Sequence, residues 1–363
     1  MDFDDIFDDE DFNEDFNKDF NDGDLNFSDH EAAELPGTEK NLRGGMDFFV
    51  RRNSVCYPAA LQPGDKIALI SPASAVKEEY VLGAMTRIME RGYQPVLMKY
   101  ALGHESGSFS ATKGDRLMDF FDAIGDPETK AILCTRGGYG SCQLLPHFSY
   151  GMKASNPKWI IGFSDVSAIL ASWYRGDIAS IHGPMAKHLA TMPADDPCTD
   201  ALFSILESGG KFNYNFPGHP YNVTGETTGV LLGGNLATLT DLADTPDDIL
   251  SLPRPNEKVI FFLEDINEPI YKVNRMLWRF VLNGTLHRLR GLILGQFTDY
   301  KPDANYDTME DMIHEFLHRN LLIMGFPVAY NFPTGHTDAN YPLVEGAKVR
   351  FKVTKENVEL ETI

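Results

Sequence analysis

Cysteine is scarce in this sequence, and long apolar runs are absent. The four cysteines, Cys56, Cys134, Cys142 and Cys198, form no CxxC pair. The chain is therefore not a disulfide scaffold, and we expect reduced, mostly buried thiols. A catalytic cysteine would need a base nearby, and none is evident. No run approaches 18 apolar residues, and the positively charged start and apolar core of a signal peptide are missing. We expect a soluble cytoplasmic protein without a membrane partner.

Positive charge is also scarce, with 32 Lys and Arg against 53 Asp and Glu and a formal net charge of −21. Residues 1–40 hold 16 acidic side chains against Lys18 and Lys40, a net of −14. The remaining chain, with 37 acids and 30 bases, carries only −7. This balance gives no electrostatic reason to expect a nucleic-acid partner. Residues 1–45 are predicted to be a disordered acidic tail, whose spaced phenylalanines leave docking to a basic partner as an alternative.

A chain of 363 residues is longer than one hydrophobic core usually supports, which favours two domains. The first, over 46–208, alternates strands with helices. Strands are predicted at 66–74, 94–101, 130–135 and 158–164, and helices at 78–93, 114–126, 141–148 and 165–176. This α/β alternation is typical of a parallel sheet covered on both faces, as in flavodoxin-like or amidotransferase-like folds. Ligands then bind at the carboxyl ends of the strands.

The composition changes at 209–226, which is rich in Gly, Pro, Asn and aromatic residues and is predicted to link the domains. A smaller C-terminal domain with a mixed sheet is expected over 227–363. Its strands are predicted at 229–234, 258–265, 291–297 and 327–332, and its helices at 271–284 and 307–322. Residues 347–363 alternate in polarity and predict a terminal hairpin.

Two glycine-containing turns fall at the carboxyl ends of predicted strands. The first is RGGYG at 136–140, where adjacent glycines allow the backbone to approach a ligand closely. It does not match the dinucleotide pattern G-x-G-x-x-G, because Gln143 occupies the third glycine position. No GxxxxGK[ST] segment occurs either. An ordinary glycine turn is the alternative interpretation.

The second turn is GFSD at 162–165, between an apolar strand and an apolar helix. A serine there exposes its hydroxyl at the strand end, next to the free N–H groups of a helix start. This is the arrangement of a nucleophile elbow, although Val166 replaces the second glycine of G-x-S-x-G. The alternative is a helix cap formed by Ser164, with Asp165 in the first turn.

Candidate partners for such a serine occur later in the chain. Glu264 and Asp265 end the predicted strand at 258–265, and Glu268 follows; a carboxylate there could orient a histidine. His336 lies in a turn directly after a glycine, and His182 in SIHGPM also follows a short strand. Each could instead be an ordinary loop or core residue.

A competing hypothesis is a zinc site, because His314–His318 spells HEFLH on a predicted helix. However, the apolar face of that helix is predicted to contain Met309, Met312, Ile313, Phe316 and Leu317. Both histidines lie off this face and beside acidic residues, which indicates a solvated surface. We therefore expect no metal.

Several blocks in order together resemble the LD-carboxypeptidase family of serine peptidases, which includes murein tetrapeptide carboxypeptidases. The blocks are GDKIALISPAS, KAILCTRGGYGSCQLLP, NPKWIIGFSDVSAIL, SIHGPM, GVLLGGNLATL, VIFFLEDINEPIYKVNRML, LRGLILGQF and PVAYNFPTGHTDANYPLVEGAKVRF. They span about residues 60–353 and leave out the acidic tail. The segment ANYPLVEG is more polar and aromatic than the family's usual run, which bears on the substrate subtype.

The resemblance implies a catalytic triad of Ser164, Glu264 and His336. It also implies an oxyanion hole of backbone N–H groups, placed at Gly138 and Asp165. It further implies a two-domain homodimer that needs no cofactor and acts on a murein tetrapeptide or related muropeptide, releasing terminal D-alanine. Arg136 and Arg275 are candidates for binding the substrate carboxylate. The alternatives are hydrolysis of peptide-nucleotide antibiotics, the zinc peptidase and a non-catalytic muropeptide-binding module.

Overall fold

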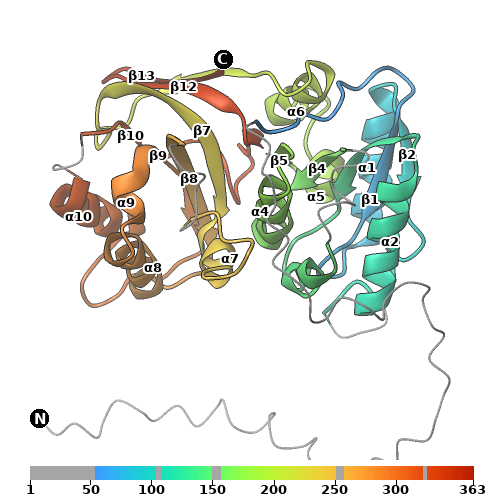
Figure 1. Cartoon of the computed structure of the whole chain (residues 1–363), viewed down its shortest axis with the longest axis horizontal. Coiled ribbons are helices and arrows are strands. Elements are labelled where there is room, and N and C mark those ends of the chain that lie inside the picture. Colours follow the sequence, from blue (N-terminus) through green and yellow to red (C-terminus); the bar gives the residue numbers. More distant parts are fainter. Residues whose placement is uncertain (1–53, 104–107, 149–156, 251–256, 322–324) are drawn as a thin grey trace, which may run out of the picture. The chain divides into compact units, whose positions relative to one another are not determined.

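A computed structural model describes residues 54–103, 108–148, 157–250, 257–321 and 325–363 (Figure 1). The tail predicted over 1–45 lies outside these residues. Within them, two sheets follow one another along the chain, each with its own set of helices. None of the described helices is both long and apolar enough to cross a membrane.

The first sheet contains six strands in the order β11-β5-β4-β3-β1-β2. Five are parallel: β1 (Lys66–Ile70), β2 (Gln94–Leu97), β3 (Thr129–Cys134), β4 (Trp159–Gly162) and β5 (Ser180–His182). The helices of this part are α1 (Glu78–Glu90), α2 (Lys113–Gly125), α4 (Ser167–Arg175), α5 (Ala186–Thr191) and α6 (Pro197–Glu207). All four residues of β4 are buried, as expected for a parallel strand covered on both faces.

The second sheet contains seven strands in the order β10-β9-β8-β7-β12-β13-β6. Its parallel part is β7 (Gly225–Asn235), β8 (Val259–Ile266), β9 (Leu289–Thr298) and β10 (Val328–Ala329). Its antiparallel part is β12 (Lys348–Val353), β13 (Asn357–Thr362) and β6 (Asn213–Pro217). The helices are α7 (Leu236–Asp241), α8 (Ile270–Leu282), α9 (Thr285–Arg288) and α10 (Met309–Leu321). A mostly parallel sheet and a mixed sheet confirm the predicted α/β class.

Three local predictions differ from the structure. The helix predicted at 141–148 is two short 3₁₀ turns, η2 (Ser141–Gln143) and η3 (Leu145–His147), because Pro146 has no N–H to continue a helix. The segment 209–226 does more than connect, since β6 lies in it and pairs with β13. The strand β11 (Leu343–Glu345) pairs antiparallel with β5, so a late segment completes the first sheet.

The two sheets share apolar packing. One cluster of buried residues joins Leu69 and Ile161 of the first sheet to Phe262 and Phe351 of the second. The helix α4 lies between the sheets (Figure 1), and its buried Ala168 packs in a cluster with residues of β7 and β8. The helix that follows Ser164 is therefore held from both sides.

Candidate active site

The serine of GFSD lies at a sharp turn between β4 and α4. β4 ends at Gly162, and Ser164 has φ 63°, in the left-handed region that residues with a Cβ rarely adopt. The 3₁₀ turn η4 (Ser164–Val166) then leads directly into α4. A Cβ on Gly162 would lie 2.7 Å from Cγ1 of Val166, so this tight turn requires glycine. The strand–turn–helix geometry places the Ser164 side chain at the tip of the turn.

Helix capping does not explain this serine. The N-cap position of α4 is Val166 and that of η4 is Phe163, and neither side chain makes a capping hydrogen bond. The carboxylate of Asp165 instead accepts a hydrogen bond from the Ser141 N–H at 2.8 Å. Ser164 is therefore not a helix cap, whereas Asp165 does lie in the first turn of η4, and its carboxylate also ties the serine turn to the segment that follows RGGYG.

The RGGYG segment packs directly against Ser164. A Cβ on Gly137 would lie 2.8 Å from the Ser164 Cβ, 3.0 Å from its Oγ and 3.2 Å from the Asp165 nitrogen. Gly138 has φ +98°, and a Cβ there would collide with the Ser74 hydroxyl. Among the described residues, no acceptor is found for the N–H groups of Gly138 and Asp165. Both donors are therefore available to a ligand.

Glu264 and His336 form a close pair at the end of β8. The His336 Nδ1 and Glu264 Oε2 atoms are 2.7 Å apart, and the side-chain exposures are 16% and 0%. Gly335 has φ +118°, and a Cβ there would lie 3.0 Å from Glu264 Oε2, so only glycine permits this approach. The His336 ring also packs against Phe163, next to Ser164, at 4.8 Å between centroids. The structure thus brings His336 and Glu264 into contact and packs the histidine ring against the residue that precedes Ser164.

Sequence models of known families match both halves of the chain. The LD-carboxypeptidase N-terminal domain matches residues 67–183, and the LD-carboxypeptidase C-terminal domain matches residues 228–351. The chain belongs to the LD-carboxypeptidase family.

Relatives of two kinds are similar to this family member. The murein tetrapeptide carboxypeptidase of Pseudomonas aeruginosa is 30% identical over 77% of this chain and 91% of its own length. The microcin C7 self-immunity protein MccF of Escherichia coli is 24% identical over 83% of this chain and 94% of its own length. Among solved structures, muramoyltetrapeptide carboxypeptidase from Oxalobacter formigenes aligns with a TM-score of 0.71 and 26% identity, covering 82% of this chain and 98% of the other.

The rival carboxylates for orienting His336 have other partners. Asp265 accepts hydrogen bonds from the Asn235 side chain at 3.1 Å and from the Ala237 N–H at 3.0 Å, at the start of α7. Burial, followed by the charge of Glu264, raises the pKa of Asp265 to about 7. Glu268 pairs with Lys272 at 3.4 Å. Glu264 is therefore the carboxylate that faces the family histidine.

The two candidate arginines lie in different surroundings. Arg136 is exposed beside Gly137, and its Nη1 donates to the Ala75 carbonyl at 2.5 Å. Arg275 is exposed on α8, with its guanidinium 5.2 Å from the ring centroid of Tyr271. Of the two, only Arg136 belongs to the loop that packs against Ser164.

A third arginine was missed by sequence reasoning. Arg116 of α2 is 2% exposed, and its guanidinium donates to the carbonyls of Pro72 and Gly140 at 2.7 and 3.1 Å. A second donation goes to the Gln143 side chain at 2.6 Å. This cation therefore holds the RGGYG segment against the end of β1. Nothing in the helical pattern of 114–126 distinguishes it from a surface arginine.

His182, the other candidate base, lies beside the pair but is enclosed. It ends β5 and is fully buried, with ring centroids 5.0 Å from Phe262 and 5.7 Å from Phe163. Burial lowers the pKa of His182 to about 4; the Glu264 charge raises it and His336 lowers it. A neutral, buried imidazole is poorly placed to remove a proton from a substrate-facing serine.

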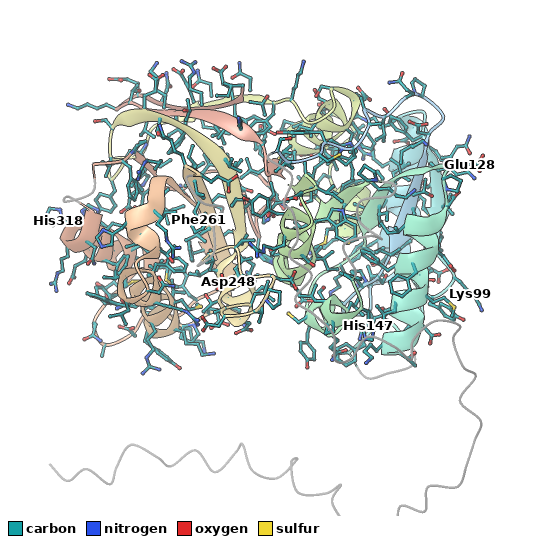
Figure 2. The ribbon with its side chains drawn as sticks, in the orientation of Figure 1. Lys99, Glu128, His147, Asp248, Phe261 and His318 are labelled. Atoms are coloured by element: carbon teal, nitrogen blue, oxygen red, sulfur yellow. The ribbon has the colours of Figure 1, made fainter. Side chains whose placement is uncertain are left out.

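The HEFLH residues contact side chains that are unrelated to a metal site. All five predicted apolar residues of α10 are buried, which confirms the predicted face. The His314 ring stacks on Tyr221 with centroids 3.8 Å apart, and Glu315 pairs with Arg319 at 2.6 Å. His318 is exposed at the outer surface (Figure 2). This arrangement fits a partly solvated helix surface.

In the described part of the chain, one group of side chains has metal-ligand chemistry and spacing. The ligand atoms of His188, Asp196 and Cys198 lie within 4.8 Å of one another. However, the Asp196 Oδ2 atom already accepts from His188 Nε2 at 2.8 Å and from the N–H and hydroxyl of Thr199, each at 2.7 Å. These bonds explain the group as the cap of α6.

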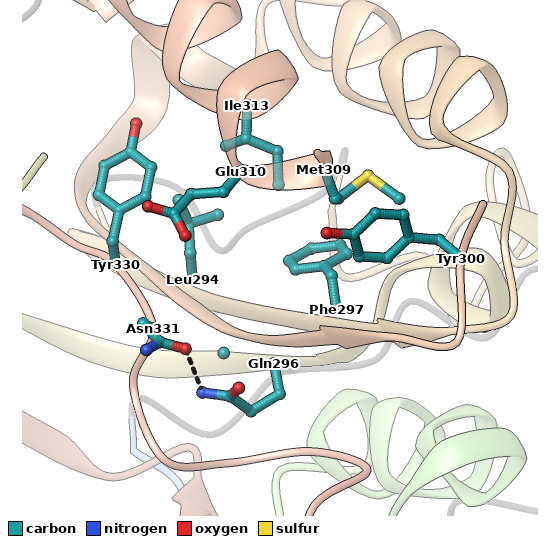
Figure 3. A pocket seen from close by; sticks show the side chains of 10 residues that line it. Leu294, Gln296, Phe297, Tyr300, Met309, Glu310, Ile313, Tyr330 and Asn331 are labelled. Atoms are coloured by element: carbon teal, nitrogen blue, oxygen red, sulfur yellow. Dashed lines mark hydrogen bonds between the residues drawn. The ribbon is translucent and has the colours of Figure 1, made fainter. Parts of the chain in front are cut away.

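A small cavity lies next to the Glu264 strand. It measures about 90 Å³ and is lined by residues of β9, α10 and the segment after β10, including Gln296, Glu310, Tyr330 and Asn331 (Figure 3). Gln296 donates to Asn331 at 2.8 Å across its floor. This volume holds only a few waters, far less than the several hundred Å³ of a ligand pocket. The cavity is therefore no candidate for the peptide site.

Proposed function

We propose that this protein is a serine LD-carboxypeptidase that releases the terminal D-alanine of a murein tetrapeptide or related muropeptide. The observation that supports this most strongly is the 2.7 Å contact between His336 Nδ1 and Glu264 Oε2 beside the Ser164 turn. A histidine held in this way has its Nε2 directed away from the carboxylate, as a general base requires. The relatives named as murein carboxypeptidases supply the substrate class.

The proposed reaction is acyl transfer. His336 takes the proton of the Ser164 hydroxyl while the oxygen attacks the carbonyl carbon of the scissile bond. The imidazolium that forms is stabilised by Glu264 and then gives its proton to the amino group of the leaving D-alanine. A water activated by the same histidine releases the acyl group from Ser164. The serine oxygen recovers its proton, so the protein ends unchanged.

Two backbone donors are proposed for the oxyanion. The Asp165 N–H directly follows Ser164, and Gly138 follows Gly137, which packs against Ser164. The loss of one oxyanion donor in a comparable site costs about 10²–10³ in rate. We propose Arg136 as the group that recognises the free carboxylate, because it is exposed one residue before Gly137. Arg275 is the second candidate for this role.

Mass spectrometry of a purified murein tetrapeptide tests the proposal. Wild type is expected to shorten the peptide by one alanine, and Ser164→Ala is expected to leave it intact. The matched control is Ser204→Ala, at an exposed serine of α6. An intact tetrapeptide after incubation with folded wild type would rule out the carboxypeptidase assignment.

Hydrolysis of a peptide-nucleotide antibiotic is the second candidate within the family. It is favoured by the match to MccF over 94% of that relative. Incubation with aspartyl sulfamoyl adenosine, the compound bound in one MccF structure, distinguishes the two. Release of aspartate with no loss of alanine from tetrapeptide would favour this function.

The remaining inferences have separate tests. Activity that survives Ser164→Ala but is lost on chelation would indicate the HEFLH zinc peptidase, and tetrapeptide binding without cleavage would indicate a binding module.

We propose a homodimer, with domains at 46–208 and 227–363, in the cytoplasm. Light scattering after size-exclusion chromatography measures the assembly, and cell fractionation measures the location.

A further inference from the structure

His182 lies behind the triad without a role in the proposed reaction. It pairs in register with Gly162, the last residue of β4, on one side and with Leu343 of β11 on the other. Its ring lies between Phe163, which adjoins Ser164, and Phe262, two residues before Glu264 on β8. Side chains two apart on a strand share one face of the sheet. The buried His182 ring therefore lies against the face of β8 that carries Glu264.

Buried polar atoms of His182 and Glu264 lack hydrogen-bond partners within the protein. In the described part of the chain, neither ring nitrogen of His182 has a hydrogen-bond partner, and neither does Oε1 of Glu264. All three atoms are buried. Buried polar atoms are almost always hydrogen-bonded, directly or through an ordered water. Glu264 Oε2, in contrast, is already occupied by His336.

The charge state of His182 suits a donor to this carboxylate. Its burial favours the neutral imidazole, which has one N–H donor and one acceptor nitrogen. A neutral donor can bind Glu264 without forming a second cation next to His336. It would also limit rotation of the carboxylate, which has a partner on one oxygen only.

We propose that His182 is a positioning residue, whose N–H holds Oε1 of Glu264 across one water so that Oε2 stays directed at His336. This inference concerns the same site as the proposed function and rests on the proposed triad, but it does not depend on the identity of the peptide. The hydroxyl of Ser164 and the backbone donors are unaffected by it.

Three substitutions test the proposal. His182→Phe fills the space between the two phenylalanines but removes the donor, and it is expected to lower kcat about 10–100-fold with little change in KM. His182→Asn and His182→Gln place an amide near one or the other ring nitrogen, and one of them is expected to recover much of the loss. His147→Phe, at an exposed histidine, is the matched control.

Two readouts separate positioning from a merely structural role. The acid limb of kcat/KM is expected to move to lower pH in His182→Phe, because a mobile Glu264 stabilises the imidazolium less. The low-field proton NMR signal of the His336 Nδ1–H is expected to weaken or shift. The proposal is overturned if folded His182→Phe keeps the wild-type kcat, acid limb and NMR signal, or if all three variants lose activity equally with that signal unchanged.

The test also works if the substrate assignment fails. The part of p-nitrophenyl acetate hydrolysis that Ser164→Ala abolishes requires no murein recognition, so kcat is measured with this ester after subtraction of the Ser164→Ala rate. Absence of tetrapeptide cleavage, together with the expected ester and NMR effects, would reject the murein substrate and keep the role of His182. Normal tetrapeptide cleavage by His182→Phe would reject the role of His182 and keep the murein substrate.

Discussion

Ser164 depends on its neighbours for a backbone conformation that it would not adopt alone. A left-handed φ costs a residue with a Cβ on the order of 1–3 kcal/mol. This cost is met by the surrounding structure: Gly162 gives room to Val166, and Asp165 is bonded to Ser141. Gly137 then lies so close to Ser164 that no side chain fits between them. The position of the hydroxyl is thus determined by contacts with three segments.

Gly137→Ala tests this dependence. The new methyl group would lie 2.8 Å from the Ser164 Cβ and 3.0 Å from its Oγ, so either the turn or the RGGYG segment must move. We expect kcat/KM to fall about 100-fold or more, because a displacement near 1 Å has that effect on reacting groups. Gly125→Ala, at the end of α2 with nothing within 4 Å, is the control and should retain full activity. Equal activity of both variants would contradict the packing argument.

Glu264→Gln tests the carboxylate at the same scale. An amide keeps the size of the side chain but cannot stabilise an imidazolium, and it can hold His336 in the wrong tautomer. We expect kcat to fall about 10³–10⁴-fold, as in a comparable triad. Glu268→Gln, which removes only the contact with Lys272, should change kcat less than about twofold. Steady-state ester hydrolysis measures both, and a similar loss in both variants would exclude a specific role for Glu264.

At this scale, the sequence was sufficient to select the proposed reacting groups but not their supports. The family resemblance selected Ser164, Glu264 and His336, because their local patterns alone also fit a helix cap, a loop carboxylate and a loop histidine. The support from Gly137, Arg116 and the Ser141 N–H depends on distances between segments that are far apart in the sequence. The helix-cap interpretation of Ser164 failed for a related reason. A serine that caps a helix and a serine at a sharp strand–helix turn have the same neighbours in sequence.

At the scale of elements, Asp265 joins β8 to the start of α7 and, through Asn235, to α4. The Asn235 side chain donates to Asp265, and the Asn235 N–H donates to Ser167 Oγ in the first turn of α4 at 3.0 Å. The strand that presents Glu264 and the helix that follows Ser164 are therefore connected by two hydrogen bonds. Sequence reasoning predicted β8 and α4 but not α7, and it treated Asp265 as a rival of Glu264.

Asp265 predicts a pH dependence of stability. Its pKa is raised from 3.8 to about 7 by burial and then by Glu264, so the native state holds a proton that the unfolded state has lost between these pH values. The free energy of unfolding should therefore fall as pH rises through this window. Asp119, with a pKa raised to about 6 by burial, contributes with the same sign. Because two groups contribute, the share of Asp265 is obtained by comparing the stability of wild type with that of a variant that lacks this carboxyl group.

Asp265→Asn removes this titration while keeping the size of the side chain. The Tm of the variant relative to wild type should rise between about pH 4.5 and pH 7.5, because only wild type pays the increasing cost of a buried charge. Differential scanning calorimetry at several pH values measures the difference. Asp195→Asn, at an exposed position just before α6, is the control. Parallel pH profiles of wild type and Asp265→Asn would show that Asp265 does not titrate in this range.

The apolar periodicity of the sequence predicts individual strands and helices but not which strands pair. Runs such as Val259–Ile266 and the spaced apolar residues of α10 predict their elements, because each is stabilised by its own pattern of burial. The short β11 has only three residues, and its place beside β5 follows from the chain returning to the first sheet. No local pattern contains that return. Pro146 was a local signal for the interrupted helix and was given too little weight.

On the scale of the whole molecule, β11 joins parts of the chain that are far apart in sequence. It comes after His336 yet completes the sheet that carries Ser164, and Tyr214 donates to the carbonyl of Pro342, next to this strand, at 2.8 Å. Buried residues of both sheets also belong to one apolar cluster. We infer that the two sheets unfold together.

Leu343→Ala tests this coupling. Leu343 is fully buried in β11, and a truncation of this kind costs about 2–5 kcal/mol of the free energy of unfolding. Because both sheets depend on the same cluster, urea transitions followed by tryptophan fluorescence and by far-UV circular dichroism should shift together and remain coincident. Leu282→Ala, at a side chain that is 83% exposed, should change the free energy by less than about 0.5 kcal/mol. Two separate transitions in Leu343→Ala would mean that the sheet carrying Ser164 and the sheet carrying Glu264 are stabilised independently. The residues of the proposed triad would then come from two bodies rather than one.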